Sequence, residues 1–336
     1  MHKQLFNEAL FTLILQPEGP LLIKAGEGDS DPTKPDMSFV RTLRNPEADK
    51  SGREAQEAET VYLPGSSLKG VLRAHCERLA RTVDSEERQQ RTGRPLACDP
   101  LHNEWSCSQR LEEDKKFSAA QKHKNSCFLC QMFGNTSLGS HLRVADAYPT
   151  GDSPRLEERN GVAIDRVFGS VAVGPFNYET VTSGTFKTTL HLRNFSLAQL
   201  GLLAIALRDL SLGRVRVGFG KSRGLGIVRG HLEALTIRYP LCQLVSNDLQ
   251  VLGGKNLGPA NQLYGIGVFA EEEYGYPSPD ETEMPDGYRY RPDEWGGEDW
   301  IGVDVEAPRV EREVDLRPLG VRCVPMWKAV VQHAAG

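Results

Sequence analysis

No uninterrupted apolar stretch of this 336-residue chain approaches the roughly 18 residues that a helix needs to cross a bilayer. The N-terminus lacks the apolar block and small-residue cleavage site of a secretory signal, because a single lysine precedes a strand-like alternation. No internal repeat is evident. These absences predict a soluble, cytoplasmic protein with no membrane partner.

Two nucleotide-binding fingerprints are missing from the glycine-rich segment GFGKSRGLG at 218–226. A P-loop ending at residues 220–222 would need glycine where Val215 stands. A Rossmann fingerprint starting at Gly218 would need glycine where Arg223 stands. The sequence therefore excludes both nucleotide-binding motifs at this segment.

An overall excess of positive charge is missing too, since the formal net charge is −5. The charge is uneven, however. Residues 271–313 hold fifteen acidic residues against four arginines, and subtracting this net charge of −11 from −5 leaves +6 on the remainder. A basic body favours a polyanionic partner, whereas an acidic run is more typical of a solvated loop.

Hydrophobic periodicity predicts the order strands, helix, strands, helix, strands. The alternation at 9–16, a Pro-Glu-Gly-Pro turn and the segment 21–24 predict an opening β-hairpin. A helix is predicted from about Ser67 to Val83, and a second is predicted from an N-cap at Ser196 to near Gly213. Further short strands are predicted at 143–147, 161–165, 185–192, 215–217 and 225–228. This order fits an α+β, ferredoxin-like sheet that carries large insertions.

Four of the seven cysteines have the spacing C-x8-C-x19-C-x2-C, at Cys98, Cys107, Cys127 and Cys130. The final C-x2-C lets two thiolates reach one metal from a tight turn, so the pattern predicts structural Zn²⁺. His102 is an alternate ligand for either early cysteine. Reduced, unrelated thiols are the competing interpretation.

Two segments have the composition of phosphate-binding turns. In YLPGSSLKGVLR, at 62–73, a proline-glycine turn and two hydroxyls precede a basic helix, which suits phosphate binding. The same residues are also consistent with a simple helix N-cap that has no binding role. In GFGKSRGLG, four glycines surround Lys221 and Arg223, which suits an anion cradle or merely a glycine-rich hairpin turn.

Four motifs occur in one order: LPGSSLKGVLR (63–73), CFLCQMFG (127–134), VAIDRVFGSVAVGPFNYETVTSGTF (162–186) and GFGKSRGLG (218–226). On these motifs the chain resembles the RAMP superfamily of CRISPR-associated proteins, most closely the backbone subunits of type III effector complexes, over roughly residues 6–235. The resemblance implies a modified RNA-recognition-motif sheet with helices on one face.

The resemblance also implies a domain plan. A core at 1–235 would contain a catalytic-loop insertion at 25–60, a zinc-binding lobe at 84–134 and a thumb β-hairpin at 162–186. An acidic C-terminal extension, 236–336, would follow it. The implied partners are CRISPR RNA, target RNA and other effector subunits: further RAMP backbone subunits, a large polymerase-like subunit and a small subunit.

Carried over by position, the residues implied to bind RNA are Ser66, Ser67, Lys69, Arg73, Arg166, Phe168, Lys221 and Arg223. Target cleavage in the family uses a loop acid with a divalent metal. Asp36 occupies the most similar position, with Asp29 and Asp31 as rivals and Mg²⁺ or Mn²⁺ as the cofactor.

Three functions therefore stay open. The leading one is a guide-binding backbone subunit that cleaves paired target RNA. The second is a non-catalytic scaffold or capping subunit of the same complex. The third is a stand-alone guide-processing endoribonuclease, which would need a general base such as His75 or His141 near the RNA.

Overall fold

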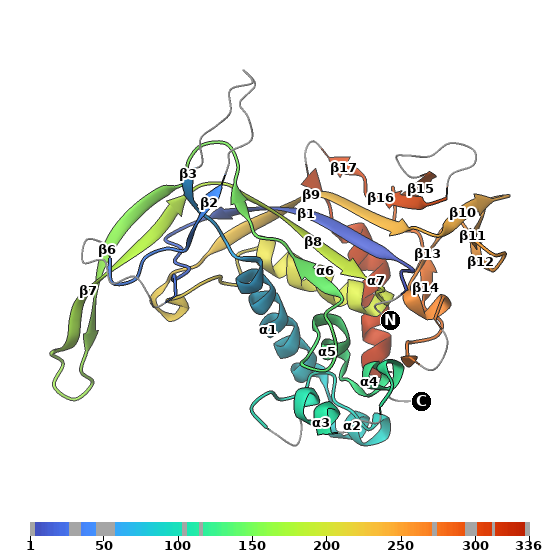
Figure 1. Cartoon of the computed structure of the whole chain (residues 1–336), viewed down its shortest axis with the longest axis horizontal. Coiled ribbons are helices and arrows are strands. Elements are labelled where there is room, and N and C mark those ends of the chain that lie inside the picture. Colours follow the sequence, from blue (N-terminus) through green and yellow to red (C-terminus); the bar gives the residue numbers. More distant parts are fainter. Residues whose placement is uncertain are drawn as a thin grey trace.

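In the computed structural model, the chain is described over residues 4–26, 35–44, 58–102, 106–113, 117–270, 274–292, 301–310 and 313–332. The centre is a sheet with helices gathered on one side of it (Figure 1). Every strand pair of that sheet is antiparallel. The predicted α+β class is confirmed.

Seven strands form the main sheet: β1 (Glu8–Pro17), β4 (Leu142–Val144), β5 (Tyr148–Pro149), β8 (Phe186–Arg193), β9 (Val228–Tyr239), β15 (Arg289–Pro292) and β16 (Val303–Glu306). Their order across the sheet is β15-β16-β9-β1-β8-β4, and β5 also pairs with β8. Strand β1 lies between β9 and β8 in the sheet. Its residues on the helix side are apolar and fully buried, as Phe11 and Leu15 are. Period-two alternation therefore turns one face of β1 toward the helices.

The helices are α1 (Gly65–Val83), α2 (Glu86–Thr92), α3 (Cys107–Glu113), α4 (Ala119–Asn125), α5 (Phe128–Phe133), α6 (Leu197–Ser211) and α7 (Arg317–Gln332). Helix α6 begins as predicted at Ser196, whose Oγ accepts a hydrogen bond from the amide of Gln199, while the Gln199 side chain accepts one from the Ser196 amide. A Cβ on Gly201 would lie 2.2 Å from the Cys323 carbonyl oxygen, so glycine lets α6 and α7 pack closely.

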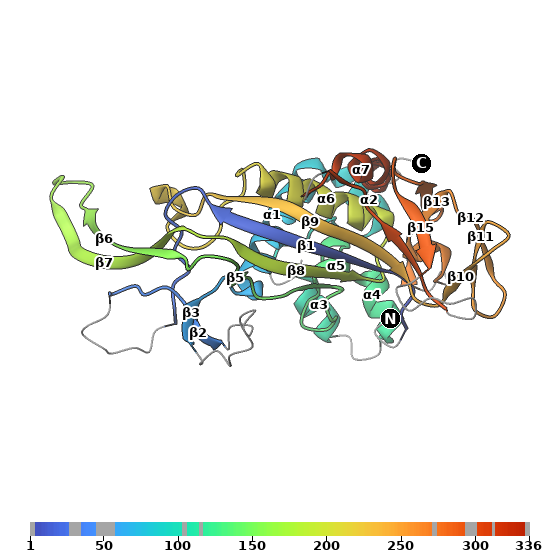
Figure 2. The same ribbon diagram turned by 90° about the horizontal axis from the view of Figure 1, so that it is seen from above.

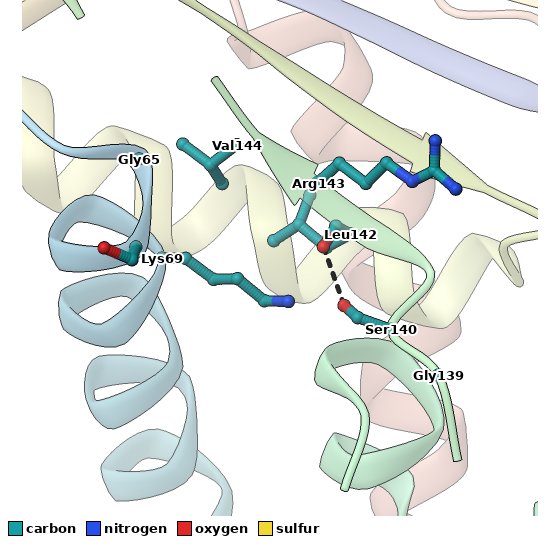
Figure 3. A pocket seen from close by; sticks show the side chains of 8 residues that line it. Gly65, Lys69, Gly139, Ser140, Leu142, Arg143 and Val144 are labelled. Atoms are coloured by element: carbon teal, nitrogen blue, oxygen red, sulfur yellow. Dashed lines mark hydrogen bonds between the residues drawn. The ribbon is translucent and has the colours of Figure 1, made fainter. Parts of the chain in front are cut away.

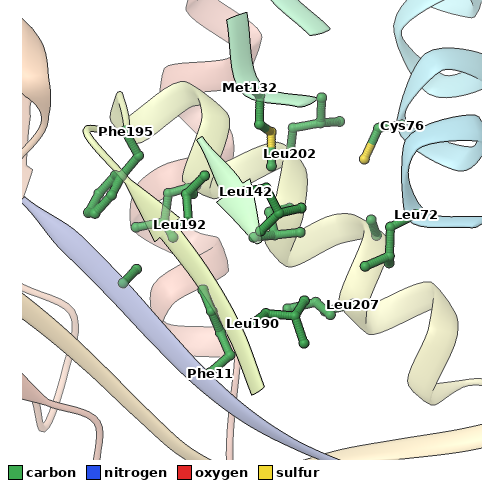
Figure 4. Close-up of a cluster of buried hydrophobic side chains, with 14 of the residues drawn as sticks. Phe11, Leu72, Cys76, Met132, Leu142, Leu190, Leu192, Phe195, Leu202 and Leu207 are labelled. Atoms are coloured by element: carbon green, nitrogen blue, oxygen red, sulfur yellow. The ribbon is translucent and has the colours of Figure 1, made fainter. Parts of the chain in front are cut away.

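The core lies between the sheet and the helices, as Figure 4 shows. Phe11 and Leu190, paired across β1 and β8, meet Leu207 of α6 and Leu72 of α1 there. In α1 the buried residues recur every fourth position at Leu68, Leu72, Cys76 and Ala80. That spacing fixes which face of α1 is buried. At the start of the helix Gly65 is buried and Ser66 is exposed.

Three predicted strand segments are wrong. Leu21–Lys24 does not form a hairpin with β1, because β8 and β9 already occupy both sides of β1. Leu21 instead makes an isolated bridge to Val181. Residues 215–217 and most of 225–228 are not strands either: the Val217 amide donates to the Gly226 carbonyl, and β9 begins at Val228.

A long hairpin projects from one end of the molecule (Figures 1 and 2). It is built from β6 (Arg155–Ile164) and β7 (Val171–Ser183). The remaining paired strands are short: β2 (Arg41–Arg44) with β3 (Ala58–Val61), β10 (Cys242–Val245) with β11 (Asp248–Val251) and β12 (Asn256–Pro259), β13 (Gln262–Tyr264) with β14 (Glu281–Glu283), and β17 (Arg309–Val310) with β18 (Glu313–Val314).

The acidic C-terminal segment shares the central sheet. Strand β9 crosses the predicted boundary at residue 235, and β16 pairs with it from Val303 to Glu306. Helix α7 packs across α6 (Figure 1). None of the helices in the described part of the chain combines the length and apolar character that a bilayer span requires.

Candidate nucleic-acid interface and metal centre

The four predicted metal ligands meet in one buried cluster. The sulfurs of Cys98, Cys107, Cys127 and Cys130 all lie within 4.8 Å of one another, and the Sγ atoms of Cys98 and Cys130 are 3.6 Å apart. Tetrahedral zinc, with Zn–S bonds of about 2.3 Å, places its sulfurs about 3.8 Å apart. The donor set and its spacing therefore fit a zinc ion with no open position, and such a site is structural. The alternate His102 is exposed and lies outside this cluster.

Backbone geometry orients the thiols. Cys127 is the N-cap of α5, and its Sγ accepts a hydrogen bond of 3.3 Å from the Cys130 amide. The Cys107 Sγ accepts one of 3.2 Å from the Cys127 amide. Amide donors favour thiolate, so the loop and helix start prepare the ligands for a cation.

The four cysteines change one another's pKa. The hydrogen bond with Cys107 lowers the pKa of Cys98, whereas the hydrogen bond with Cys107 raises the pKa of Cys130. Four thiolates this close repel one another, so without a metal some of the cysteines must keep their protons. A bound divalent cation offsets the repulsion and displaces those protons. Metal binding therefore releases protons and weakens as the pH falls.

A pocket of about 530 Å³ lies at the start of α1 (Figure 3). We call it the α1 pocket. Its lining residues are Gly65, Ser66, Lys69, Gly139, Ser140, Leu142, Arg143 and Val144. One wall is the motif LPGSSLKGVLR, and the other is the segment from Gly139 to Val144. The pocket thus combines a helix start, hydroxyls and two cations, which is a chemistry suited to phosphate.

Gly65 allows the two walls to approach. A Cβ there would lie 2.2 Å from the Val144 carbonyl oxygen, and the Gly65 amide donates to Asp146 Oδ1 at 2.7 Å. Lys69 extends from α1 toward Ser140 (Figure 3). Burial and the neighbouring Arg73 charge lower the pKa of Lys69. An anion in the α1 pocket would stabilise the charged form of Lys69.

The predicted RNA-binding residues of α1 lie in different surroundings. Ser66 and Lys69 line the α1 pocket, whereas Ser67 is half-buried and is not among the lining residues. Arg73 faces the cysteine cluster: its Nη2 donates to Cys130 Sγ at 3.6 Å and its Nη1 donates to the Gly134 carbonyl at 3.1 Å.

The glycine-rich segment forms a tight loop around a short 3₁₀ turn, Lys221–Arg223, whose side chains are exposed. Gly218 and Gly226 have φ values of 83° and 85°. A Cβ on Gly226 would lie 2.1 Å from the Val217 carbonyl oxygen, so glycine is required there. The Arg223 guanidinium lies 5.3 Å from the ring centroid of Phe176 on β7. This cation–π contact holds the loop against the hairpin.

Asp36 reaches the same strand. Its exposed carboxylate accepts a hydrogen bond of 2.8 Å from the Asn177 amide, and the next residue, Met37, donates to the Asn177 carbonyl at 3.1 Å. We call Asp36, Phe176, Asn177 and Arg223 the hairpin base. Residues Asp29 and Asp31, the rivals for the catalytic role, lie outside the described residues.

The hairpin tip presents apolar side chains to solvent. Phe168 is 84% exposed and Val167 is 82% exposed. The Asp165 carboxylate accepts hydrogen bonds from the amides of both residues, at 2.7 and 2.8 Å, which fixes the turn. Arg166 is exposed beside them. A rigid turn that exposes an aromatic ring provides a stacking surface for a base.

Comparison with known proteins then decides the family. A sequence model of the RAMP superfamily matches residues 15–229, which is more than half of the chain. The chain belongs to the RAMP superfamily. Members of this family bind CRISPR RNA and act in complexes, so the chain is a CRISPR-associated RNA-binding protein. A search of curated proteins finds no match.

The sequence predictions for this RAMP protein missed the second wall of the α1 pocket. Gly139, Ser140 and Arg143 lie in GNTSLGSHLR, directly after the cysteine motif. The small and polar residues before a basic strand in this segment could have indicated a binding surface. Neither of the two histidines weighed as general bases lines the α1 pocket. His75 is 2.9 Å from the Asp209 carboxylate, and His141 is 2% exposed.

Proposed function

We propose that this protein is a CRISPR RNA-binding backbone subunit of a type III effector complex that cleaves guide-paired target RNA. The observation that carries the proposal is the α1 pocket, because it gathers Lys69, Arg143, Ser66 and Ser140 around one space. Strands and helices in the order β1, α1, β4, β8, α6, β9, with β9-β1-β8-β4 across the sheet, support a ferredoxin-like, modified RNA-recognition-motif core.

In this proposal the α1 pocket binds guide phosphates. Cations and hydroxyls that contact the phosphate backbone give affinity without a sequence preference. A guide of variable sequence needs that property. Lys221 and Arg223, both exposed on the glycine-rich loop, supply further positive charge at the hairpin base.

The β6–β7 hairpin serves as the thumb that wedges between nucleotides. Its exposed tip residue Phe168 offers a ring to the unstacked base, and the Asp165 turn keeps that ring outside the body of the protein. Arg166 beside it can contact a phosphate. Base stacking on an aromatic ring contributes about 1–3 kcal/mol per base.

Asp36 is the proposed catalytic carboxylate, acting with Mg²⁺ or Mn²⁺. Its position at the hairpin base would place it where the kinked target strand passes. Within the described residues Asp36 belongs to no cluster of three or more possible metal ligands. Mg²⁺ commonly binds one or two carboxylates together with substrate phosphates, so RNA would supply the remaining oxygens. The metal would stabilise charge on the scissile phosphate and assist attack by the adjacent 2′-hydroxyl.

Because Asp36 belongs to no such ligand cluster within the described residues, one alternative is favoured: a scaffold or capping subunit that binds the guide RNA without cutting the target. The two functions differ in one experiment on the assembled complex. Asp36→Asn keeps an oxygen that can accept from the Asn177 amide, yet it removes the charge that a metal requires. We expect target cleavage to slow by at least about 100-fold, with guide binding unchanged.

Asp152→Asn is the matched control, since Asp152 is an exposed aspartate in a surface turn. Cut products are followed over time on a gel with a labelled, guide-complementary target. Unchanged cleavage by the Asp36 variant would assign the scaffold role to this subunit.

A further inference from the structure

The helix that carries the α1 pocket is also tied to the metal centre through one side chain. Arg73 lies one turn after Lys69 and uses all three of its guanidinium nitrogens: Nε donates to Glu77 Oε1 at 2.8 Å, Nη1 to the Gly134 carbonyl at 3.1 Å and Nη2 to Cys130 Sγ at 3.6 Å. These three bonds direct the guanidinium toward the cysteine cluster.

Gly134 packs against the opposite wall of the α1 pocket, the segment from Gly139 to Val144. A Cβ on Gly134 would lie 2.8 Å from the Ser140 amide nitrogen, so the two residues are in close contact. The His141 amide donates to the Met132 carbonyl of α5 at 3.0 Å, and the Ser140 hydroxyl, which donates to the Leu142 carbonyl at 2.7 Å, lies 3.3 Å from the same Met132 oxygen. This wall is therefore hydrogen-bonded to α5, the helix that supplies Cys130.

The charge at the site favours the same coupling. A zinc ion with four thiolates carries a net charge of −2 in a buried position, which is costly without nearby cations and donors. Arg73 brings a permanent positive charge and an N–H donor to one of those sulfurs. Partners of this kind hold a metal ligand in place and raise metal affinity.

We propose that Arg73 is a positioning residue that couples the metal centre to the α1 pocket, so that metal occupancy sets the RNA affinity of the pocket. With zinc bound, Cys130 and the Gly134 carbonyl hold the guanidinium, and α1 and the 139–144 wall keep their spacing. Without zinc the four sulfurs are no longer held to one centre, α5 shifts, and the wall loses its support. This inference rests on the proposed function of the α1 pocket.

The test compares Arg73→Ala and Arg73→Lys with Arg78→Ala in the full-length protein. Arg78 is the matched control because it is exposed on the same helix and its hydrogen bond goes to His75. Zinc affinity is measured by competition with a chelator, and RNA affinity is measured with a guide-length single strand over a range of salt concentrations.

We expect Arg73→Ala to weaken zinc binding by about 10-fold or more and to weaken RNA binding without changing its salt dependence. Arg73→Lys keeps the positive charge but cannot make the three hydrogen bonds of the guanidinium. Its zinc and RNA affinities should therefore lie between those of the alanine variant and the wild type. In the Co²⁺-substituted protein, the thiolate-to-metal absorption shifts in both variants but not in Arg78→Ala.

A phosphate contact at Arg73 would give the opposite pattern: unchanged zinc affinity and Co²⁺ spectrum, with the slope of log affinity against log salt reduced by about 0.7. That result would overturn the coupling. If Lys69 and Arg143 variants bind RNA normally while Arg73 still controls zinc affinity, the proposed function of the pocket fails but the role of Arg73 at the metal stands.

Discussion

Replacing Lys69 and Arg143 together with alanine is expected to weaken binding of guide-length RNA by about 100-fold. The two cations line the α1 pocket from opposite walls, and each charge-assisted hydrogen bond to phosphate contributes about 1.5–3 kcal/mol, or roughly tenfold or more. Because each neutralised phosphate of a single strand contributes about 0.7 to the salt slope, the double variant should also reduce that slope by about 1.4.

The matched control is the double variant Arg291→Ala and Arg317→Ala. Both arginines lie outside residues 15–229, and each is paired locally, Arg291 with Glu306 and Arg317 with Asp315. The control removes the same charge, so any non-specific electrostatic effect appears in both proteins. Fluorescence anisotropy with two unrelated guide sequences measures affinity. Equal losses in the pocket variant and the control would show that net charge, and not the α1 pocket, binds RNA.

Removal of the metal is expected to unfold the lobe that contains α2, α3, α4 and α5. Structural zinc supplies about 10 kcal/mol or more of binding free energy in small sites, and the four buried cysteines join the segment before α3, the start of α3 and the start of α5 in this lobe. Cys127→Ser and Cys130→Ser should each abolish stoichiometric zinc and expose the lobe to protease. The sheet and α6 keep their own buried core and should resist cleavage.

Elemental analysis and limited proteolysis with mass-spectrometric mapping of the cut sites measure these two effects. Cys242→Ala is the control, because Cys242 is buried on β10 outside the cluster. Zinc affinity should also fall as the pH is lowered, since protons compete for the thiolates. A protein that contains no zinc at neutral pH, with the lobe intact, would contradict the assignment of a structural metal.

The sequence predicted the elements whose signals are local. The alternation around Phe11 and Leu15 marks β1, Ser196 marks the start of α6, and the C-x2-C spacing marks two ligands of the cysteine cluster. These features depend on neighbouring residues alone, so periodicity, capping and ligand spacing are enough to find them.

Features that depend on distant partners were predicted poorly. Leu21–Lys24 has the composition of a strand, but β1 is paired on both sides by strands that lie more than 150 residues away in the sequence. The wall that includes Ser140 and Arg143 reaches the α1 pocket only because β4 pairs with β8 and α5 packs near α1. Nothing in the local sequence specifies those contacts.

The proposed work is divided between two parts of the protein, the α1 pocket and the hairpin base. The α1 pocket is lined by the two cations proposed to bind the guide backbone, while the hairpin base places Asp36 and Arg223 beside β7. Binding and cutting then depend on different residues. Substitutions at the hairpin base should leave guide binding measurable, and substitutions in the α1 pocket should leave target cleavage measurable.

The most direct test of the central claim is to sequence the RNA that co-purifies with the affinity-tagged full chain from its native cells. A CRISPR RNA-binding backbone subunit should retain RNAs of guide length that share a repeat-derived tag and differ in the remaining sequence. The Lys69→Ala and Arg143→Ala double variant should retain far less of this RNA. Bound RNA without a common tag, or no RNA at all, would contradict the account.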